Sequence, residues 1–201
     1  MEFITFLEII GTITGLTHLW LLTRQKISAW IFGIICVSIY MYISYDAKYY
    51  SDAILNGCFF VLNVFGWYNW ARKKVENEEV KVTRLSSSGL SVSIAIIVIG
   101  TLLWGWFMST KTDASIPYPD AFTTVASLTA QYLLTQKKID NWIIWMVVNV
   151  VAIPMYIYKG LYITAGLFFV YLLLCISGFI EWRKEMKEEK RKLKISDHLI
   201  N

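Results

Sequence analysis

Residues 26–31 read KISAWI, and residues 138–143 read KIDNWI. Placing Trp30 over Trp142 sets an offset of 112 residues (142 − 30) between the two stretches. The same offset, kept without a gap, pairs Glu8 with Asp120, Leu16-Thr17 with Leu128-Thr129, Gly66 with Gly178, and Trp70 with Trp182. Two Trp pairs, a Lys pair and a Gly pair would rarely align by chance in one register, so the sequence predicts an internal repeat.

Long apolar runs surround the repeated stretch. The 201 residues are 56% hydrophobic and 17% charged, whereas soluble domains average about 45–50% and about 25%. A bilayer accepts this apolar surface, and a crossing helix needs about 20 residues. Seven segments qualify: Phe3–Leu22, Ser28–Tyr45, Ser51–Ala71, Gly89–Phe107, Asp120–Leu134, Asn141–Tyr158 and Leu161–Glu181. The sequence predicts an all-α membrane protein with seven transmembrane helices.

The repeat divides these helices into two triplets. Three crossings leave the chain on the opposite side, and the fourth helix returns it, so the two triplets enter the membrane in the same orientation. The predicted 3+1+3 layout places the first three-helix repeat at residues 1–71 and the second at 120–182. Between them lie a flexible cytoplasmic loop (72–88) and the linker helix with its outer loop (89–119). Residues 183–201 form a charged cytoplasmic tail that extends the last helix or frays.

The basic residues predict an orientation. Of the 19 Lys and Arg residues, only Lys48, Lys111 and Lys159 fall on one side of the predicted membrane, and the other sixteen fall on the opposite side. Under the positive-inside rule the N-terminus lies outside and the C-terminus in the cytoplasm. The sequence therefore predicts a multi-pass protein of the cell membrane, the inner membrane in a two-membrane cell.

No pattern indicates a metal site, a cofactor or an enzyme. Cys36, Cys58 and Cys175 lie in apolar runs without a CxxC motif, so we expect small, buried packing residues. His18 and His198 have no nearby ligands for zinc. A Walker motif for ATP hydrolysis is absent from the sequence. We predict no catalytic residue and no metal ligand.

Polar side chains at mid-depth are the candidates for a substrate site, because polar atoms in lipid are costly and often functional. Amides offer donors and acceptors, and aromatic faces offer stacking and cation–π attraction. Together they suit a neutral or cationic heteroaromatic ring with hydroxyl groups, and they suit a phosphate poorly since no Arg or Lys lies at mid-depth. The candidates are His18, Trp30, Asn56, Asn63, Trp67, Gln131, Trp142, Trp145 and Asn149.

Structural alternatives exist for several of these residues. A membrane Asn can simply bond a neighbouring helix. Trp residues near helix ends, here Trp30, Trp70, Trp142 and Trp182, are typical of an interfacial aromatic belt. Gly33, Gly57, Gly66 and Gly178 are expected to allow close helix packing. The carboxylates of Glu8, Asp46, Asp52, Asp120 and Asp140 all sit near helix ends, so we expect facilitated diffusion rather than ion-driven transport.

Three stretches resemble the PnuC family of vitamin transporters. Residues 25–33 read QKISAWIFG, residues 63–70 read NVFGWYNW and residues 140–145 read DNWIIW, followed by Asn149. The second and third are similar to the family's GWYxW and NWxxW signatures. The resemblance extends from Glu8 to Trp182.

The resemblance implies a 3+1+3 homotrimer that moves a dephosphorylated vitamin, with a cytoplasmic kinase trapping it. The family's best-known member carries nicotinamide riboside, and similar proteins carry thiamine, riboflavin or deoxynucleosides. Cys36 stands where relatives often have Asn, which leaves the substrate open. A non-transporting receptor or scaffold is the alternative of another class, and a membrane-embedded enzyme lacks the polar cluster it would need.

Overall fold

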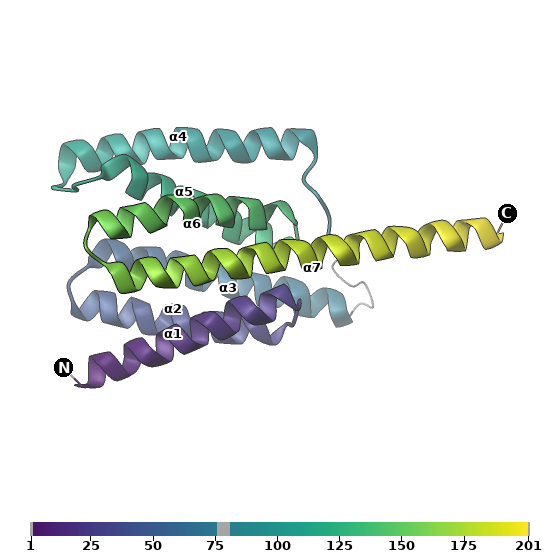
Figure 1. Cartoon of the computed structure of the whole chain (residues 1–201), viewed down its shortest axis with the longest axis horizontal. Helices are drawn as coiled ribbons and strands as arrows, with labels where there is room; N and C mark the ends of the chain where they lie inside the picture. Colours follow the sequence, from purple (N-terminus) through teal and green to yellow (C-terminus); the bar gives the residue numbers. More distant parts are fainter. Residues whose placement is uncertain (1, 76–80, 201) are drawn as a thin grey trace.

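The computed structural model describes residues 2–75 and 81–200, and seven helices cover most of that part of the chain (Figure 1). They are α1 (Glu2–Thr23), α2 (Ser28–Asp46), α3 (Tyr50–Val75), α4 (Ser87–Lys111), α5 (Pro117–Thr135), α6 (Asp140–Tyr158) and α7 (Tyr162–Ile200). The two ends of the chain lie at opposite ends of the bundle, as an odd number of crossings requires. The predicted all-α fold with seven helices is confirmed.

The helix bounds reproduce the repeat residue by residue. Adding 112 to the bounds of α2 gives 140–158, which are the bounds of α6. The last residues of α1 and α5, Thr23 and Thr135, differ by the same offset. So do the first residues of α3 and α7, Tyr50 and Tyr162. The two parallel triplets predicted from the sequence are therefore present.

The turns between the first two helices of each triplet are also equivalent. Gln25 and Lys137, again 112 apart, take positive φ angles of 53° and 50°. The next residue in each turn donates its backbone N–H to a carbonyl of the preceding helix, Lys26 to Leu21 and Lys138 to Leu133, both at 3.0 Å. This left-handed residue followed by a bond back into the last helical turn ends both helices in the same way.

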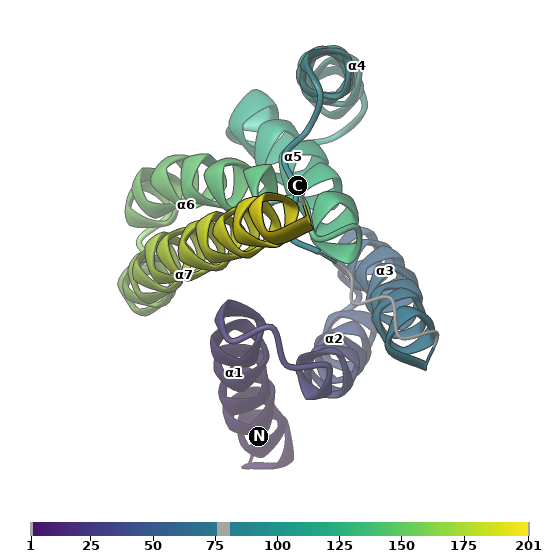
Figure 2. The same cartoon turned by 90° about the vertical axis from the view of Figure 1, so that its right-hand side faces the viewer.

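The triplets meet along two seams. Within them, α1 packs on α2 and α2 on α3, while α5 packs on α6 and α6 on α7. Between them, α3 packs on α5 and α1 packs on α7, so the third helix of each triplet contacts the first helix of the other. Figure 2 shows this ring of six helices end on, with α4 outside it beside α5.

Five of the helices in the described part are long and apolar enough to span a membrane on their own, and α3 and α5 are not among them. These two helices contact each other at a seam, and α5 buries eight residues, among them Ser127, Gln131 and Thr135. Their polar side chains face protein rather than lipid, which lowers their hydropathy without exposing polar atoms to the bilayer.

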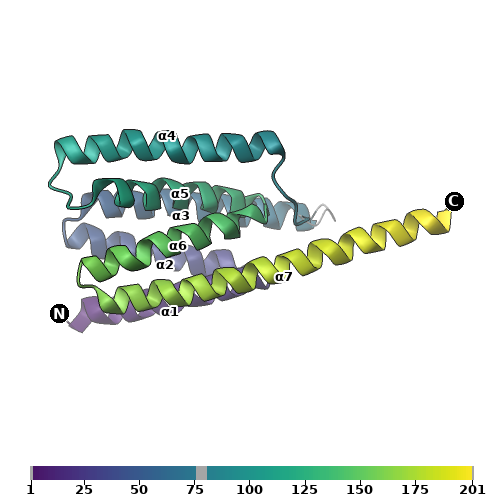
Figure 3. The ribbon, with the colours of Figure 1, turned by 45° about the horizontal axis from the view of Figure 1, so that its top comes forward.

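Several helix ends differ from the predicted bounds. α3 continues four residues beyond position 71, to Val75. α4 begins earlier, at Ser87, because the Ser86 hydroxyl accepts the Gly89 N–H at 3.1 Å. α5 begins at Pro117, a favoured first helical position for proline. α7 continues through the charged tail to Ile200 and projects beyond the bundle (Figure 3).

Residues 81–86, here called the strap, are held against the α5–α6 turn. Thr83 donates its N–H to the Lys137 carbonyl at 3.2 Å and accepts the Ile139 N–H at 2.9 Å. A carboxylate oxygen of Asp140 accepts the Leu85 N–H at 2.8 Å, and the Val82 side chain is buried in the core. The prediction of a flexible loop is wrong for this part, because backbone bonds outweigh its polar composition.

We expect the Asp140→Ala variant to release the strap. A hydrogen bond to a charged acceptor contributes about 1.5–3 kcal/mol, so the strap should open at least about tenfold more often. Limited trypsin digestion after Lys81 and Arg84 should then speed up by a similar factor, with the helical bundle unchanged by circular dichroism. Thr83→Ala, which removes only an exposed side-chain bond to Lys138, is the control. Equal cleavage rates in the two variants would contradict this role of Asp140.

Candidate substrate site

Four tryptophans form a continuous chain of rings across both triplets. Ring centroids lie 5.2 Å apart for Trp30 and Trp70, 6.1 Å for Trp70 and Trp182, and 5.4 Å for Trp182 and Trp142. Each of these side chains is at most 3% exposed. The expectation of an interfacial belt is wrong for all four, because the helix ends that carry them meet inside the protein.

The two central indoles connect the triplets. Trp70 of α3 donates its Nε1–H to the Thr135 carbonyl at the end of α5, at 3.1 Å. Trp182 of α7 donates to the Leu22 carbonyl near the end of α1, at 3.0 Å. Each bond runs from the third helix of one triplet to the first helix of the other, so this end of the seam is closed.

The two outer indoles have no such partner. The Nε1–H groups of Trp30 and Trp142 are buried and make no hydrogen bond within the described residues. A buried indole N–H usually finds an acceptor. These repeat-related donors are therefore available to a ligand or to water, which fits the candidacy of both residues for the substrate site.

Three other candidate side chains gather around Gly33 of α2. The Gln131 amide of α5 donates to the Asn63 Oδ1 of α3 at 3.4 Å, and His18 Nδ1 of α1 bonds the Ala29 carbonyl at 2.7 Å. A Cβ atom at Gly33 would collide with Asn63 Oδ1 and lie 2.7 Å from His18 Nδ1. The absence of a side chain at Gly33 thus lets His18, Asn63 and Gln131, here called the polar group, come together.

Asn149 lies in the other triplet with different neighbours. It is buried in α6, and its amide donates to the Trp145 carbonyl at 2.7 Å and to Cys175 Sγ at 3.6 Å. Cys175 stands 112 residues after Asn63. One triplet therefore presents an amide where the other presents a thiol, so the two halves line the interior with different chemistry.

The remaining candidates are more peripheral. Trp145 is half-buried and packs against the tryptophan core. Trp67 is 44% exposed, and the Asn56 amide donates to the Asp52 carbonyl of its own helix. No hydrogen bond or ring contact among the described residues joins Trp67 or Asn56 to the polar group. The helical spacing that put them on the face of Asn63 follows a straight helix, and the interior narrows away from them.

The glycine and cysteine expectations are mostly confirmed. A Cβ at Gly66 would collide with the Trp30 ring, and one at Gly178 would lie 2.6 Å from the Trp142 ring. Gly57 is different, since its nearest neighbour would lie 3.8 Å away, an ordinary contact. Cys175 is buried as expected, but Cys58 is exposed.

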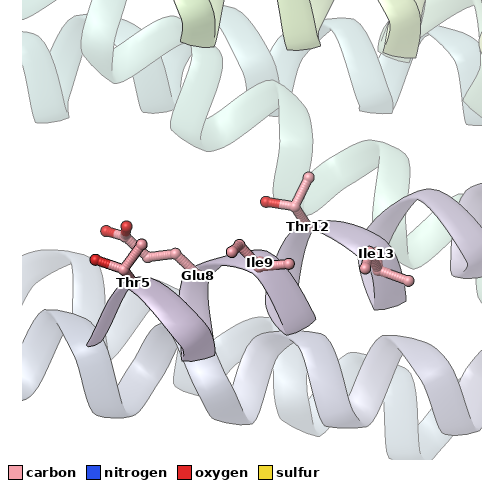
Figure 4. A pocket seen from close by; sticks show the side chains of 5 residues that line it. All are labelled: Thr5, Glu8, Ile9, Thr12 and Ile13. Carbon is pink, nitrogen blue, oxygen red and sulfur yellow. The ribbon is translucent and has the colours of Figure 1, made fainter. Parts of the chain in front are cut away.

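A pocket at the other end of α1 was not singled out in the sequence. It is lined by Thr5, Glu8, Ile9, Thr12 and Ile13, and its volume is about 250 Å³ (Figure 4). Glu8 was grouped with the carboxylates near helix ends, and its sequence position gives no sign of a cavity beside it. The signal that could have found it is the polar spacing of Thr5, Glu8 and Thr12 along one side of an otherwise apolar helix.

Within the described residues, no three His, Cys, Asp or Glu side chains come close enough to hold a metal ion. The buried polar side chains found there are uncharged: Thr23, Asn63, Ser93, Ser127, Gln131, Thr135, Asn141 and Asn149. Such an interior can hydrogen-bond a neutral or singly charged ring and its hydroxyl groups. It offers no counter-ion for a phosphate.

Comparison with known proteins places these features in a family. The family model described as nicotinamide mononucleotide transporter matches residues 5–184. The nicotinamide riboside transporter PnuC of Escherichia coli (strain K12) is 26% identical, with 92% of this chain and 88% of that protein covered. PnuC of Neisseria mucosa is 29% identical, with 91% and 74% covered.

A further relative and a solved structure extend the comparison. The riboflavin/roseoflavin transporter RibM of Streptomyces davaonensis is 22% identical over 94% of this chain and 90% of its own length. A crystal structure of the vitamin B3 transporter PnuC superimposes with a TM-score of 0.73, at 27% identity, covering 92% of this chain and 83% of that one. The similarity spans both triplets and the linker helix.

Proposed function

Because the chain belongs to the nicotinamide mononucleotide transporter family, we propose that it carries nicotinamide riboside across the membrane by facilitated diffusion. Family membership makes it a multi-pass membrane transporter of a small vitamin and not an enzyme. The riboside is the solute named for its relatives in Escherichia coli and Neisseria mucosa. A cytoplasmic kinase would phosphorylate the riboside after uptake and so prevent its return.

The observation that carries this choice is the uncharged interior around Gly33. Asn63 and Gln131 offer amide donors and acceptors, and the unpartnered indole N–H groups of Trp30 and Trp142 offer two further donors. These groups match a carboxamide and ribose hydroxyls. A mononucleotide would bring a phosphate into a space with no buried Arg or Lys among the described residues, at a large desolvation cost.

Facilitated diffusion rests on the carboxylates. No Asp or Glu is buried in the part of the chain that the structure describes. Proton relays in transporters usually place a carboxylate inside the membrane-spanning bundle. Uptake would therefore follow the substrate gradient. The proposed orientation has the N-terminus outside and the tryptophan chain toward the cytoplasm, and the proposed assembly is a homotrimer.

Riboflavin is the second candidate solute, because RibM covers nearly the whole chain. Thiamine and deoxynucleosides are further options within the same fold. Cys36 bears on this choice, since its Sγ donates to the Gly11 carbonyl at 3.3 Å and its side chain is only half-buried. A thiol there offers a ligand less hydrogen bonding than an amide.

A binding panel on purified protein tests the proposal. Nicotinamide riboside should raise the unfolding temperature in detergent, because a ligand that binds only the native state stabilises it by mass action. Nicotinamide mononucleotide, riboflavin, thiamine and thymidine should raise it less at equal concentration. Uptake into proteoliposomes should occur without an accompanying proton current. Stabilisation by riboflavin alone would overturn the proposed solute, and a proton current that tracks uptake would overturn facilitated diffusion.

A further inference from the structure

Glu8 is a carboxylate within a membrane-spanning helix. α1 begins at Glu2, and its span from Phe3 to Thr23 is long and apolar enough to cross a bilayer. At 1.5 Å per residue, Glu8 lies about 9 Å along the helix from its start. No hydrogen bond or ion pair of its carboxylate is found among the described residues. An ionisable side chain at such a position is costly without a partner, so it indicates function.

The repeat shows which partner is missing. Asp120, the equivalent of Glu8, accepts two hydrogen bonds from Lys159 Nζ, at 2.9 and 3.2 Å. The residue equivalent to Lys159 in the first triplet is Ala47 (159 − 112). The second triplet therefore neutralises its carboxylate internally, whereas the first triplet keeps the acid and lacks the base. The place of a cation beside Glu8 is left for a ligand.

The pocket beside Glu8 supplies further complementary groups. Thr5 and Thr12 carry hydroxyl groups, and Ile9 and Ile13 supply an apolar wall (Figure 4). The Thr12 hydroxyl is hydrogen-bonded to the Tyr40 hydroxyl of α2 at 3.1 Å, which fixes it at the rim. A negative charge, hydroxyls and an aliphatic surface together suit a cationic ring that bears hydroxyl groups.

The pocket also lies at the start of a continuous line of features along α1. One turn beyond Thr12, a Cβ at Gly15 would lie 3.1 Å from Cys36 Sγ and 3.5 Å from the Tyr171 hydroxyl of α7. Here α1 meets the other triplet. His18 of the polar group follows one turn later. The pocket thus stands outside the α1–α7 seam, on the helix that also contributes to the interior site.

We propose that this pocket is an outer receiving site for a cationic, hydroxylated ring, and that the Glu8 carboxylate selects for its positive charge. This rests on the proposed function and deepens it, because nicotinamide riboside carries a pyridinium charge. Phosphorylated solutes are repelled at the same place. Charged clefts raise the local concentration of oppositely charged solutes and speed their association, and salt weakens the effect.

The test is uptake kinetics in proteoliposomes with two solutes of nearly one shape. Nicotinamide riboside is a cation, and its dihydro form is neutral. In the Glu8→Gln variant we expect the KM for the cation to rise about fivefold to tenfold, with an unchanged KM for the dihydro form. The wild-type KM for the cation should increase with ionic strength, and that dependence should disappear in the variant.

Two further variants sharpen the test. Ala47→Lys rebuilds the internal ion pair of the second triplet and should raise the KM for the cation as Glu8→Gln does. Asp113→Asn removes an exposed carboxylate from the segment between α4 and α5 and should leave both KM values unchanged. Unfolding temperatures of all variants are measured alongside, to show that each is folded.

The outcomes separate the two proposals. Wild-type protein that neither binds nor transports nicotinamide riboside overturns the proposed function and this inference with it. Wild-type transport with an unchanged KM in both Glu8→Gln and Ala47→Lys overturns only the receiving site. A loss that is equal for the cation and the dihydro form also overturns it, because charge selection predicts a difference between the two.

Discussion

Replacing Gly178 by alanine is expected to destabilise the fold by about 3 kcal/mol or more. The new Cβ would lie 2.6–2.7 Å from three atoms of the Trp142 ring. That ring is fully buried, and Trp182 packs against it with centroids 5.4 Å apart, so it has no room to retreat. Overpacking a tight core costs about 1–3 kcal/mol, and a rigid aromatic neighbour puts this site at the upper end.

Gly166 on the same helix is the matched control. A Cβ there would meet nothing within 4 Å. Alanine is the better helix former by about 1 kcal/mol, so Gly166→Ala should leave the unfolding temperature unchanged or raise it. For a chain of this size, 3 kcal/mol corresponds to a decrease of about 6–12 °C for Gly178→Ala. Equal unfolding temperatures for the two variants in detergent would show that Trp142 is not held as described.

Replacing Asn63 by leucine is expected to abolish most substrate binding while the fold remains. Leucine has nearly the volume of asparagine but cannot hydrogen-bond, and Gln131 would lose only a long bond of 3.4 Å. A site built to hydrogen-bond its ligand loses about 1.5–3 kcal/mol per charged or well-placed partner. We therefore expect at least a tenfold weaker affinity for nicotinamide riboside by calorimetry.

Asn56→Leu on the same helix provides the comparison. Its amide bonds only its own helix, to the Asp52 carbonyl, so the loss of affinity should be several times smaller than at Asn63. Unfolding temperatures within about 3 °C of the wild type would show that both variants are folded. An unchanged affinity in Asn63→Leu, or an equal loss in the two variants, would remove Asn63 from the substrate site.

The sequence was a good guide wherever one register governs both halves. The offset of 112 residues predicted equivalent helices, and the structure places equivalent turns at Gln25 and Lys137 as well. Local backbone geometry follows local sequence, so similar stretches end their helices alike. The offset could not predict the strap, because Thr83 bonds to residues more than fifty positions away.

Depth was the weaker part of the prediction. A position near a helix end told us that Trp70 and Trp182 lie toward the membrane surface, and this suggested an aromatic belt. It could not tell which side of the helix faces protein, since that depends on how helices from different triplets cross. The same limit applies to the site. The sequence selected Asn63 and Gln131 separately, and only the α3–α5 seam brings them together.

The crossed bonds of Trp70 and Trp182 constrain how the closed end can open. Each indole holds the other triplet's first helix, one bond on either side of the axis that relates the halves. Turning one triplet as a rigid body stretches both bonds together, and no rotation relaxes one while keeping the other. Opening is therefore an all-or-none event with a single barrier, and the transporter exchanges between two discrete shapes without a half-open intermediate.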